Sequence, residues 1–375
     1  MPAIFMVTIL TISALYAPQP LLPVIVDSFD VSSTRAAALT TVSFVPLALA
    51  PLFYGPFLER FHPLRLLRWG VLLLALSEGL FFLAPEFSQL LLLRLCQGLL
   101  IPALLIAAMT YLSTTSIAGQ VPRVMATYIA ATIVGGLLGR VCSGFLASLW
   151  GWRSSFLVLG FSLLAAYLLL LPLEADAPKK ETETERSWQL LPQVLGRRLF
   201  RRVYLMVFCF FFAFAAIMNF IPFRLYEISG AADEWRVGLI YCGYLMGVVS
   251  ALSAVRVKER LGSERRVVML GLSAYLAVLL VMWLPQVPVL FVAMFLFCGA
   301  MFLVHATATG WLNRLSDQHK GTVNGLYVAS YYGGGMAGSF VPGFVYQAWG
   351  WGAFILLLAG VVSAALFLSL GLADS

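Results

Sequence analysis

Apolar residues fill most of the chain in long runs, and charged residues, prolines and glycines separate one run from the next. Each run is close to the roughly 20 residues with which an α-helix crosses a bilayer. Such segments have to be helical, because lipid offers no hydrogen-bond partner to a bare backbone. We therefore predict twelve transmembrane helices, at approximately residues 4–26, 36–58, 67–84, 88–112, 123–148, 154–172, 203–223, 237–255, 267–284, 287–312, 321–347 and 352–371.

A long polar stretch at residues 173–202 divides this pattern into two sets of six runs. It begins with the charged, low-complexity sequence EADAPKKETETERS and ends in the basic sequence GRRLFRR. This composition is typical of a solvated hinge with an edge at the membrane surface. The fold class we predict is an all-α membrane protein, with one six-helix bundle at 1–172, a cytoplasmic linker at 173–202 and a second bundle at 203–375.

The composition excludes a soluble protein. Of the 375 residues, 61% are hydrophobic and 11% are charged, and the mean hydropathy is +0.93, whereas soluble domains are about 45–50% apolar and about 25% charged. A cytosolic enzyme, a nucleic-acid-binding protein and a secreted disulfide scaffold are therefore excluded. The five cysteines are odd in number and form no close pair, which indicates neither disulfides nor a zinc site. We predict no metal and no cofactor.

The basic residues are distributed unevenly over the loops and predict the orientation. Of the 24 Lys and Arg residues, eighteen lie in the even-numbered gaps between predicted helices and four in the odd-numbered gaps. Because cytoplasmic loops are enriched in Lys and Arg, we expect both termini in the cytoplasm. The net charge of +7 then reflects these loops and not a nucleic-acid partner.

The two sets of runs are related by an internal repeat. At an offset of 199, the sequence YIAATIVGGLLGRVCSGFLASLWGW matches YVASYYGGGMAGSFVPGFVYQAWGW at glycines and tryptophans. The identical pairs include Tyr128 with Tyr327, Gly135 with Gly334, Gly139 with Gly338, Gly144 with Gly343 and Trp150 with Trp349. A parallel repeat of two six-helix halves is the internal symmetry of one large class of secondary transporters.

Two loops repeat as well, at an offset of 200: GPFLERFHPLR at 55–65 and VRVKERLGSERR at 255–266. Both resemble the signature G-x-x-x-D-R-x-G-R-R of the major facilitator superfamily, and the resemblance covers the whole chain. The acid is Glu instead of Asp in both copies, His62 and Pro63 interrupt the first, and Val255 replaces the glycine of the second. The residues that we assign to these gate loops are Gly55, Glu59, Arg60, Arg65, Glu259, Arg260 and Arg265.

A narrower resemblance is to bacterial inner-membrane permeases of the YnfM-like, arabinose-efflux-permease-like branch. It is carried by YAPQPLLP at 16–23, GGLLGR at 135–140, and His305 followed by the Tyr-Tyr-Gly run at 331–333. The superfamily resemblance implies alternating access, with helix 5 packed on helix 8 and helix 2 on helix 11. The glycines expected at these seams are Gly135, Gly139, Gly144, Gly243, Gly247, Gly334, Gly338 and Gly343, and static packing explains them equally well.

Ionisable residues inside spans are costly and point to function. Arg94 opens the sequence RLCQG, which resembles a superfamily element tied to proton coupling, and Arg140 interrupts a row of small residues in helix 5. Two buried guanidinium groups favour an anionic substrate or a counter-carboxylate. For proton coupling we select Asp27, Glu78 and Arg94; the alternatives are an aqueous helix end for Asp27 and an internal pair with Arg for Glu78.

Polar side chains on the remaining inner faces complete a predicted substrate cavity. The proline-broken helix 1 offers backbone carbonyls as well as side chains, and a histidine titrates near physiological pH. An internal hydrogen bond is the alternative for His305, and packing is the alternative for the two tyrosines that follow it. The cavity residues that we predict are Tyr16, Gln19, Arg94, Gln97, Arg140, Asn219, His305, Tyr331 and Tyr332.

These features predict a secondary active transporter that moves a small organic solute, with proton-coupled efflux as the expected mode. A proton-linked importer and an exporter of an anionic metabolite, such as a carboxylate siderophore, stay open as alternatives. A membrane-embedded enzyme is disfavoured because the three histidines lie far apart, and a receptor is disfavoured because no signalling domain is attached. The predicted partners are the solute, protons and membrane lipid, with no nucleic acid, and the expected state is a monomer.

Overall fold

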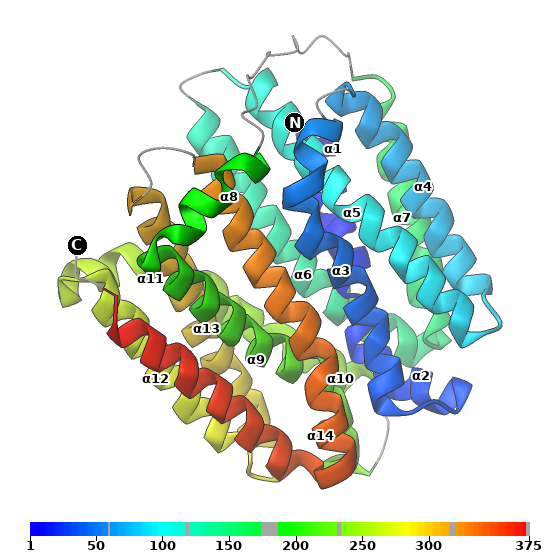
Figure 1. The fold of residues 1–375 in the computed structure, drawn as a ribbon. Helices are drawn as coiled ribbons and strands as arrows, with labels where there is room; N and C mark the ends of the chain where they lie inside the picture. The colour runs from blue at the N-terminus through cyan, green and yellow to red at the C-terminus, as the bar shows by residue number, and fades with distance from the viewer. Residues whose placement is uncertain (59–60, 118–119, 174–186, 231–233, 316–319, 373–375) are drawn as a thin grey trace.

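The computed structural model describes residues 1–58, 61–117, 120–173, 187–230, 234–315 and 320–372. Every regular element in these ranges is a helix (Figure 1). The elements are α1 (Pro2–Tyr16), η1 (Gln19–Leu21), α2 (Leu22–Phe29), α3 (Ser33–Leu58), α4 (Pro63–Leu83), α5 (Phe87–Thr115), α6 (Val121–Trp150), α7 (Arg153–Leu170), α8 (Ser187–Gly196), α9 (Arg198–Ser229), α10 (Glu234–Ile240), η3 (Tyr241–Gly243), α11 (Tyr244–Leu261), α12 (Glu264–Val281), α13 (Val287–Leu315) and α14 (Lys320–Leu370).

The all-α prediction is confirmed, but the structure does not confirm the count of twelve spans exactly. Ten helices of the described chain are long and apolar enough to cross a membrane. One of them lies in α14, which covers two predicted spans and folds back on itself at Gly350, where φ is +74°. α12 is left out of the ten, because its first turn carries Glu264, Arg265 and Arg266.

Two predicted spans contain a break in the α-helix. In the first, the prolines at 18, 20 and 23 interrupt the backbone hydrogen bonds, so that α1, η1 and α2 follow one another. Pro18 has no N–H to offer to the carbonyl of Ala14, which leaves that carbonyl open to another donor. In the second, α10 passes into η3 and then α11 at Tyr241–Gly243.

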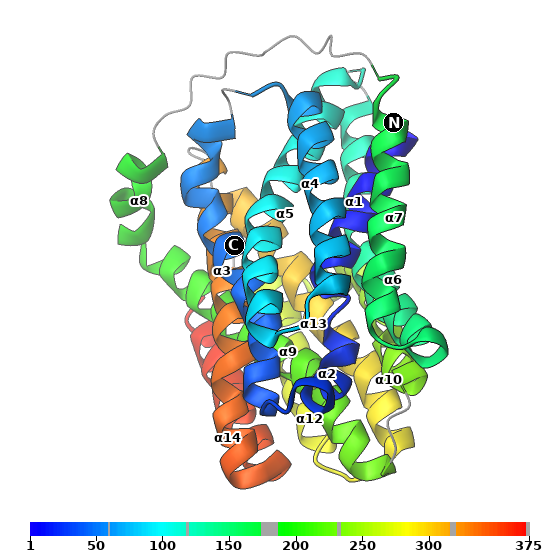
Figure 2. The same cartoon turned by 90° about the vertical axis from the view of Figure 1, so that its right-hand side faces the viewer.

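Following the repeat in the sequence, we call α1–α7 the first half and α9–α14 the second half. Within the first half α4 packs on α7 and α1 on α6, and within the second half α9 packs on α14. Across the halves, α3 packs along the first arm of α14 (Figure 2), and α6 packs on α10. These two contacts are the ones expected from the resemblance, between predicted helices 2 and 11 and between predicted helices 5 and 8. Part of the predicted linker is helical, because α8 lies in it and α9 already begins at Arg198.

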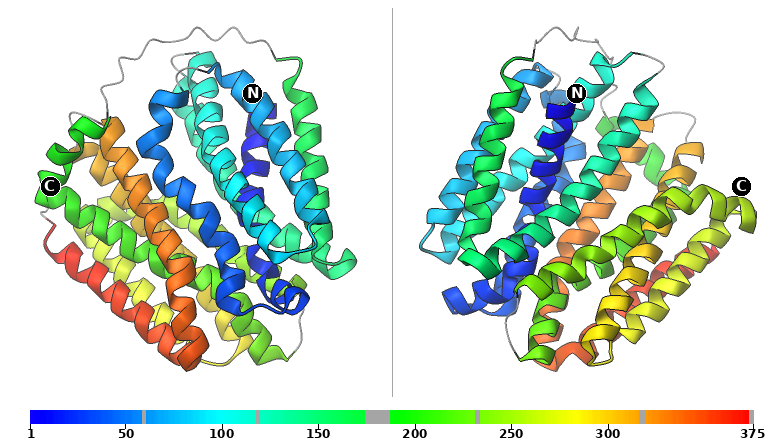
Figure 3. Two further views of the ribbon diagram at one scale, coloured as in Figure 1. Left: turned by 45° about the vertical axis from the view of Figure 1, so that its right-hand side comes forward. Right: turned by 180° about the vertical axis from the view of Figure 1, so that it is seen from behind.

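The two ends of the bundle differ in how the halves meet. We call the end at which α1 begins and α3 and α11 finish the terminal end, and the other the far end. The second half spreads away from the first toward the terminal end (Figure 3, right). The far end is joined by contacts such as the hydrogen bond from Thr34 to Gln347 and the ring contact of Phe145 with Trp235.

Candidate functional site

Arg140 is a buried cation that α6 places between the two halves. The residue is 1% exposed. Its Nε donates to Oε1 of Gln19 at 2.7 Å, and its Nη1 donates to the carbonyl of Gly136 at 2.6 Å. Among the described residues, no carboxylate lies within ion-pair distance of this guanidinium. Arg140 therefore lies at the interface without an acidic partner in the described chain.

Gln19 and Asn219 connect the halves and are 200 positions apart, so they are mates in the repeat. Nε2 of Gln19 donates to Oδ1 of Asn219 at 2.9 Å. Nδ2 of Asn219 in turn donates to the carbonyl of Ser339 at 3.2 Å. Because Ser339 is the repeat mate of Arg140, the Gln19–Arg140 contact of the first half has its counterpart in the Asn219–Ser339 contact of the second half.

A further pair of repeat mates closes this arrangement. Cζ of Arg140 lies 5.3 Å from the ring centroid of Tyr241, and the hydroxyl oxygens of Ser339 and Thr41 are 2.7 Å apart. Thr41 and Tyr241 are also 200 positions apart, so each half reaches the other in the same way. We call this set the axis network; its members are Gln19, Thr41, Arg140, Asn219, Tyr241 and Ser339.

Aromatic rings surround the guanidinium of Arg140. Its Cζ lies 3.9 Å from the ring centroid of Tyr16 and 4.5 Å from that of Tyr244. Rings at this distance stabilise a cation through the negative charge density of their faces. We call the rings that continue from here the aromatic cluster; they are Tyr16, Phe44, Phe211, Phe214, Tyr244, Tyr331 and Tyr332.

Ring contacts run through the aromatic cluster in a closed circuit. Tyr16 meets Phe44 at 6.1 Å between centroids, and Phe44 meets Phe211 of the other half at 6.5 Å. Phe211 stacks on Phe214 at 5.7 Å, and Phe214 meets Tyr244 at 5.9 Å. Since Tyr16 and Tyr244 both face the same guanidinium, the circuit takes residues from both halves and closes on one charge.

Three residues predicted for the cavity join this cluster. Tyr331 stacks on Phe211 at 3.5 Å, and Tyr332 lies 5.9 Å from Phe44. The ring of His305 lies 4.8 Å from that of Tyr331, and its Nδ1 is 2.8 Å from the hydroxyl of Tyr327. His305, Tyr331 and Tyr332 are half-buried, as is Tyr16, so these side chains keep part of their surface accessible although they lie between packed helices.

Arg94 is buried too, but the first half saturates it with hydrogen bonds. Its Nη1 and Nη2 donate to the carbonyls of Ala14 and Leu15 at 2.9 and 2.7 Å, at the proline break of the first span. Its Nε donates to the carbonyl of Leu39 at 3.1 Å, and Nη1 also donates to Oε1 of Gln97 at 2.7 Å. The structure therefore separates Arg94 and Gln97 from the aromatic cluster and joins them to the packing of α1, α3 and α5.

The two acids predicted for proton coupling lie in different surroundings. Glu78 in α4 is fully buried, and neither carboxyl oxygen has a hydrogen-bond partner in the described chain. The predicted alternative was an internal pair with Arg. The carboxylate makes no described hydrogen bond or close ion pair with an Arg, but the charges of Glu78 and Arg94 interact through the interior of the first half. Asp27 lies near the end of α2 and is exposed, so the structure does not bring it together with Glu78 and Arg94.

The gate loops are only partly described. Glu59 and Arg60 lie outside the described residues, Gly55 is part of α3, and Arg65 is exposed in the first turn of α4. In the second loop, Glu259 and Arg260 are exposed at the end of α11, while Arg265 is half-buried. Among the described residues, the carboxylate that forms ion pairs here is one the sequence reasoning did not select, Glu264.

Glu264 begins α12 and connects three helices. Its carboxylate pairs with Nζ of Lys258 in α11 at 2.6 Å and with the guanidinium of Arg314 in α13. Burial raises the pKa of Glu264, but the hydrogen bonds from Lys258 and from its own backbone amide, with the charges of Arg314 and Lys258, outweigh burial and hold that pKa below its ordinary value. Glu264 therefore carries a negative charge at the terminal end.

The selected glycines separate into two groups according to what a Cβ would meet. A Cβ on Gly139 would lie 2.6 Å from Cα of Ser13 in α1, and one on Gly338 would lie 2.0 Å from the carbonyl oxygen of Phe212 in α9. These approaches are within one half, and the same holds for Gly135, Gly243, Gly247 and Gly334. The seam assignment is corrected for these six, because the small residues let helices of the same half approach closely.

Gly144 and Gly343 do face the other half. A Cβ on Gly144 would lie 2.5 Å from the carbonyl oxygen of Glu234 in α10. One on Gly343 would lie 2.6 Å from the ring of Phe220 in its own half and 2.9 Å from the hydroxyl of Thr34 in α3 of the other half. The two glycines are mates in the repeat, so the far end is closed by the same close approach on both sides.

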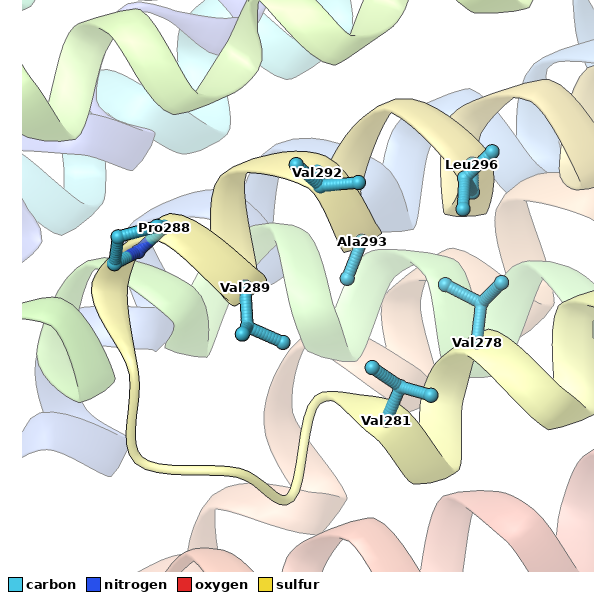
Figure 4. A pocket seen from close by; sticks show the side chains of 7 residues that line it. All are labelled: Val278, Val281, Pro288, Val289, Val292, Ala293 and Leu296. Carbon is cyan, nitrogen blue, oxygen red and sulfur yellow. The ribbon is translucent and has the colours of Figure 1, made fainter.

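Two surface grooves carry no charged residue. One, of about 320 Å³, lies between α12 and α13 and is lined by apolar residues alone, as Figure 4 shows. The other, of about 200 Å³, lies among α1, α6 and α7, and its lining hydroxyls include Ser13 and Ser155, which both donate to backbone carbonyls. Since neither groove carries a charged side chain, we assign the functional site to the axis network and the aromatic cluster.

Several residues of the site were missed by sequence reasoning, above all Phe44, Thr41, Tyr241, Tyr244 and Ser339. The repeat contained the signal that would have identified most of them. At an offset of 200, Gln19 leads to Asn219, Thr41 to Tyr241 and Phe44 to Tyr244. Pairs in which both positions carry a polar or aromatic side chain inside a span therefore mark the interface of the halves.

The repeated helical halves and a polar site between them define a membrane transporter fold. A family model described as "Major Facilitator Superfamily" matches residues 4–257. The chain therefore belongs to the Major Facilitator Superfamily and is a membrane-spanning transporter, as the resemblance implied.

Relatives over nearly the whole chain are transporters of the same kind. The chain is 27% identical to "Inner membrane transport protein YnfM" of Escherichia coli (strain K12), over 95% of this chain and 87% of that protein. It is 26% identical to "Uncharacterized MFS-type transporter YybF" of Bacillus subtilis (strain 168), over 97% of this chain and 91% of that protein. These similarities confirm the YnfM-like branch, and transporters of this family are not enzymes.

Solved structures share the fold at low sequence identity. A single-substitution mutant of the nucleoside transporter NupG superimposes with a TM-score of 0.83 at 11% identity, covering 99% of this chain and 98% of that one. A bacterial homologue of the human lysosomal transporter Spinster, in an inward-facing and unoccupied conformation, gives a TM-score of 0.78 at 15% identity, covering 99% and 93%. They confirm the architecture.

Proposed function

We propose that the protein is a proton-coupled secondary transporter that exports a small organic solute through the bacterial inner membrane by alternating access. The observation that carries this proposal is the axis network, in which repeat mates of the two halves bind one another around Gln19 and Asn219. A transporter built from two related halves needs such a symmetric contact, because the same halves have to close first one end and then the other.

The position of the contacts between the halves supports one conformation of this cycle. In the described chain, the polar and ring contacts across the halves involve residues 19–44 and 140–145 of the first half and 211–244 and 332–347 of the second. All of these lie in the middle of the helices or toward the far end. With both termini in the cytoplasm, this arrangement corresponds to an inward-open state.

The terminal end carries the groups that we assign to the opposite closed state. The ion pairs of Glu264 hold the ends of α11, α12 and α13 together as one unit. The exposed charges of Arg65, Glu259 and Arg260 lie at the same end. We expect them to pair across the halves when the terminal end closes, and to lose these partners in the inward-open state.

For proton coupling we assign Glu78. A carboxyl group that is fully buried without a hydrogen-bond donor is far more stable neutral than charged, so it has to take up a proton in this state. Arg94 belongs to the same half and holds the break of the first span in place. A rearrangement of that break would change the electrostatic surroundings of Glu78, which links proton release to the conformational change.

The export of an anionic solute is the second candidate, and it is favoured by the guanidinium of Arg140, which has no carboxylate partner among the described residues. A buried cation without a carboxylate partner is costly, and an anion between the halves would relieve that cost.

The test uses membrane vesicles of both orientations, loaded with a pH-sensitive dye and supplied with candidate solutes. Export by proton exchange predicts that adding the solute to acidified inside-out vesicles releases protons, so that the dye fluorescence recovers. Vesicles with Arg140→Gln protein serve as the control and should not respond. Alkalinisation outside right-side-out vesicles would identify an importer, and no solute-dependent proton movement in either orientation would refute proton coupling.

A further inference from the structure

The interface between the halves indicates three properties of the ligand that it would bind. These are the charge of the ligand, its shape and its contacts with both halves. This inference rests on the proposed transport function and names its substrate class.

The charge of the ligand follows from Arg140. Apart from Glu78, the described acidic residues lie at helix ends or in loops: Asp27, Asp30, Glu86, Glu227, Glu234, Glu259 and Glu264. No described contact brings a carboxylate to Arg140, whose described hydrogen-bond partners are the neutral oxygens of Gln19 and Gly136. An amine would therefore find a like charge and no acid at this site, whereas a carboxylate would find a guanidinium that matches its two oxygens.

The shape of the ligand follows from the rings. The circuit of the aromatic cluster presents flat faces from α1, α3, α9, α11 and α14. Tyr16, Tyr331 and Tyr332 are half-buried although packed rings surround them, so each keeps surface with which to contact a guest. Faces and edges of this kind favour a planar ring over a branched aliphatic group of equal size.

The ligand would be held from both halves. Arg140 and Tyr16 belong to the first half, and Tyr244, Tyr331 and Tyr332 belong to the second. His305 adjoins the cluster with Nδ1 engaged by Tyr327, and no hydrogen bond at Nε2 occurs among the described contacts. A guest with a carboxylate at one edge and a ring behind it would thus contact both halves at the point where they must separate.

We propose that the site between the halves binds monoanionic planar organic acids, with the carboxylate on Arg140 and the aromatic ring among Tyr16, Tyr244, Tyr331 and Tyr332. On binding, the carboxylate would take over the guanidinium face that the rings of Tyr16 and Tyr244 cover.

The experiment measures equilibrium binding to the full-length protein in lipid nanodiscs, with radiolabelled benzoate as the probe. Benzamide, benzylamine and cyclohexanecarboxylate compete as ligands that lack the charge, reverse it or lack the planar ring. We expect each to compete at least about tenfold more weakly than unlabelled benzoate, a difference of about 1.4 kcal/mol. Benzylamine or benzamide that competes as well as benzoate, or no saturable benzoate binding, would overturn the proposal.

Variants locate the site. Arg140→Gln should weaken benzoate binding at least about tenfold, and Tyr332→Leu should weaken benzoate more than cyclohexanecarboxylate. Arg123→Gln is the matched control, because Arg123 is an exposed arginine of the same helix, and it should bind as the wild type does. Unchanged binding by monodisperse Arg140→Gln protein would overturn the assignment; if that variant does not fold, the ligand comparison on the wild type decides.

The outcome is separable from that of the proposed function. Benzoate binding without solute-dependent proton movement in vesicles would refute proton-coupled transport and leave the ligand class intact. Proton-coupled transport of a neutral or cationic solute, with no competition by benzoate, would refute the ligand class alone.

Discussion

Arg94 and Arg140 are both buried arginines inside the bundle, and their surroundings differ in kind. Arg94 donates to three backbone carbonyls and one side-chain oxygen of its own half, at 2.7–3.1 Å. Arg140 donates to one carbonyl and one amide oxygen, and two tyrosine rings cover it. Burial alone therefore does not identify a charged side chain as functional. The number of protein oxygens that already bind the charge distinguishes a structural arginine from one that is available to a ligand.

The physical reason lies in what each arginine would leave behind. Without Arg94, the carbonyls of Ala14 and Leu15 would lose the guanidinium that bonds them in an apolar interior. The carbonyl of Leu39 would keep the hydroxyl of Ser43 as a donor. Without Arg140, Gln19 and Asn219 still bind each other across the halves. We infer that Arg94 holds the broken first span in place, while Arg140 is available to a ligand.

The largest expected effect is the loss of stability in Arg94→Gln, and it tests the structural role that we give to Arg94. Two unpaired buried carbonyls should lower the free energy of unfolding by about 2 kcal/mol or more, since each costs about 1–3 kcal/mol. Thermal unfolding in detergent, followed by loss of the monodisperse peak, measures this. A variant as stable as the wild type but inactive would place Arg94 among the transport residues instead.

Arg140→Gln should show the reverse pattern, with folded protein that no longer transports. Truncating a charge that binds a buried anion costs about 2–5 kcal/mol, so we expect transport to fall by a factor of roughly 30 or more. Initial rates in vesicles, normalised to protein in the membrane, measure it. Equal losses of stability in Arg140→Gln and Arg94→Gln would remove the distinction between them.

Two glycines, Gly139 and Gly144, allow packing within a half to be compared with contact across the halves. Gly139→Ala places a Cβ against Ser13 of the same half, and Gly144→Ala places one against Glu234 of the other half. Each clash should cost about 1–3 kcal/mol. We expect Gly139→Ala to lower the melting temperature alone and Gly144→Ala to open the far end.

The readout is the labelling of Thr34→Cys, in a cysteine-free background, by a maleimide that does not cross membranes. Thr34 is buried and bonded to Gln347 at the far end, so labelling from outside reports its opening. Faster labelling in Gly139→Ala than in Gly144→Ala would contradict the assignment.

The smallest effect concerns Glu264, a charge that does have ionic partners. Because its folded pKa lies below the ordinary 4.5, its ion pairs stabilise the fold fully above that value, and the contribution is lost as the pH falls through the folded pKa. We expect the stability difference between wild type and Glu264→Gln, below about 1 kcal/mol for such partly exposed partners, to vanish as the pH falls below 4.5 and through the folded pKa. The difference between wild type and Arg94→Gln should persist, since carbonyls do not titrate.

The sequence was sufficient to predict where the long helices lie and that the two halves are related by a repeat. Apolar runs of membrane length predicted helices at every place where the structure has a long one, since each span satisfies its own backbone wherever it packs. The offset of 199–200 related the halves because glycines that permit close approach recur at the same places. It also pointed to Gln19, Arg140 and Asn219, which the structure joins, and to Arg94 and Gln97, which it places elsewhere.

Only the tertiary structure decided which partner each side chain has. The sequence treats Arg94 and Arg140 alike, because both are single cations in apolar runs, and it prefers Glu259 to Glu264, because the motif position is counted along the chain. Which oxygen a guanidinium reaches depends on how α1 breaks at its prolines and on where α6 crosses it. Those are consequences of packing between segments far apart in the chain, such as Gln19 and Arg140, and no local pattern encodes them.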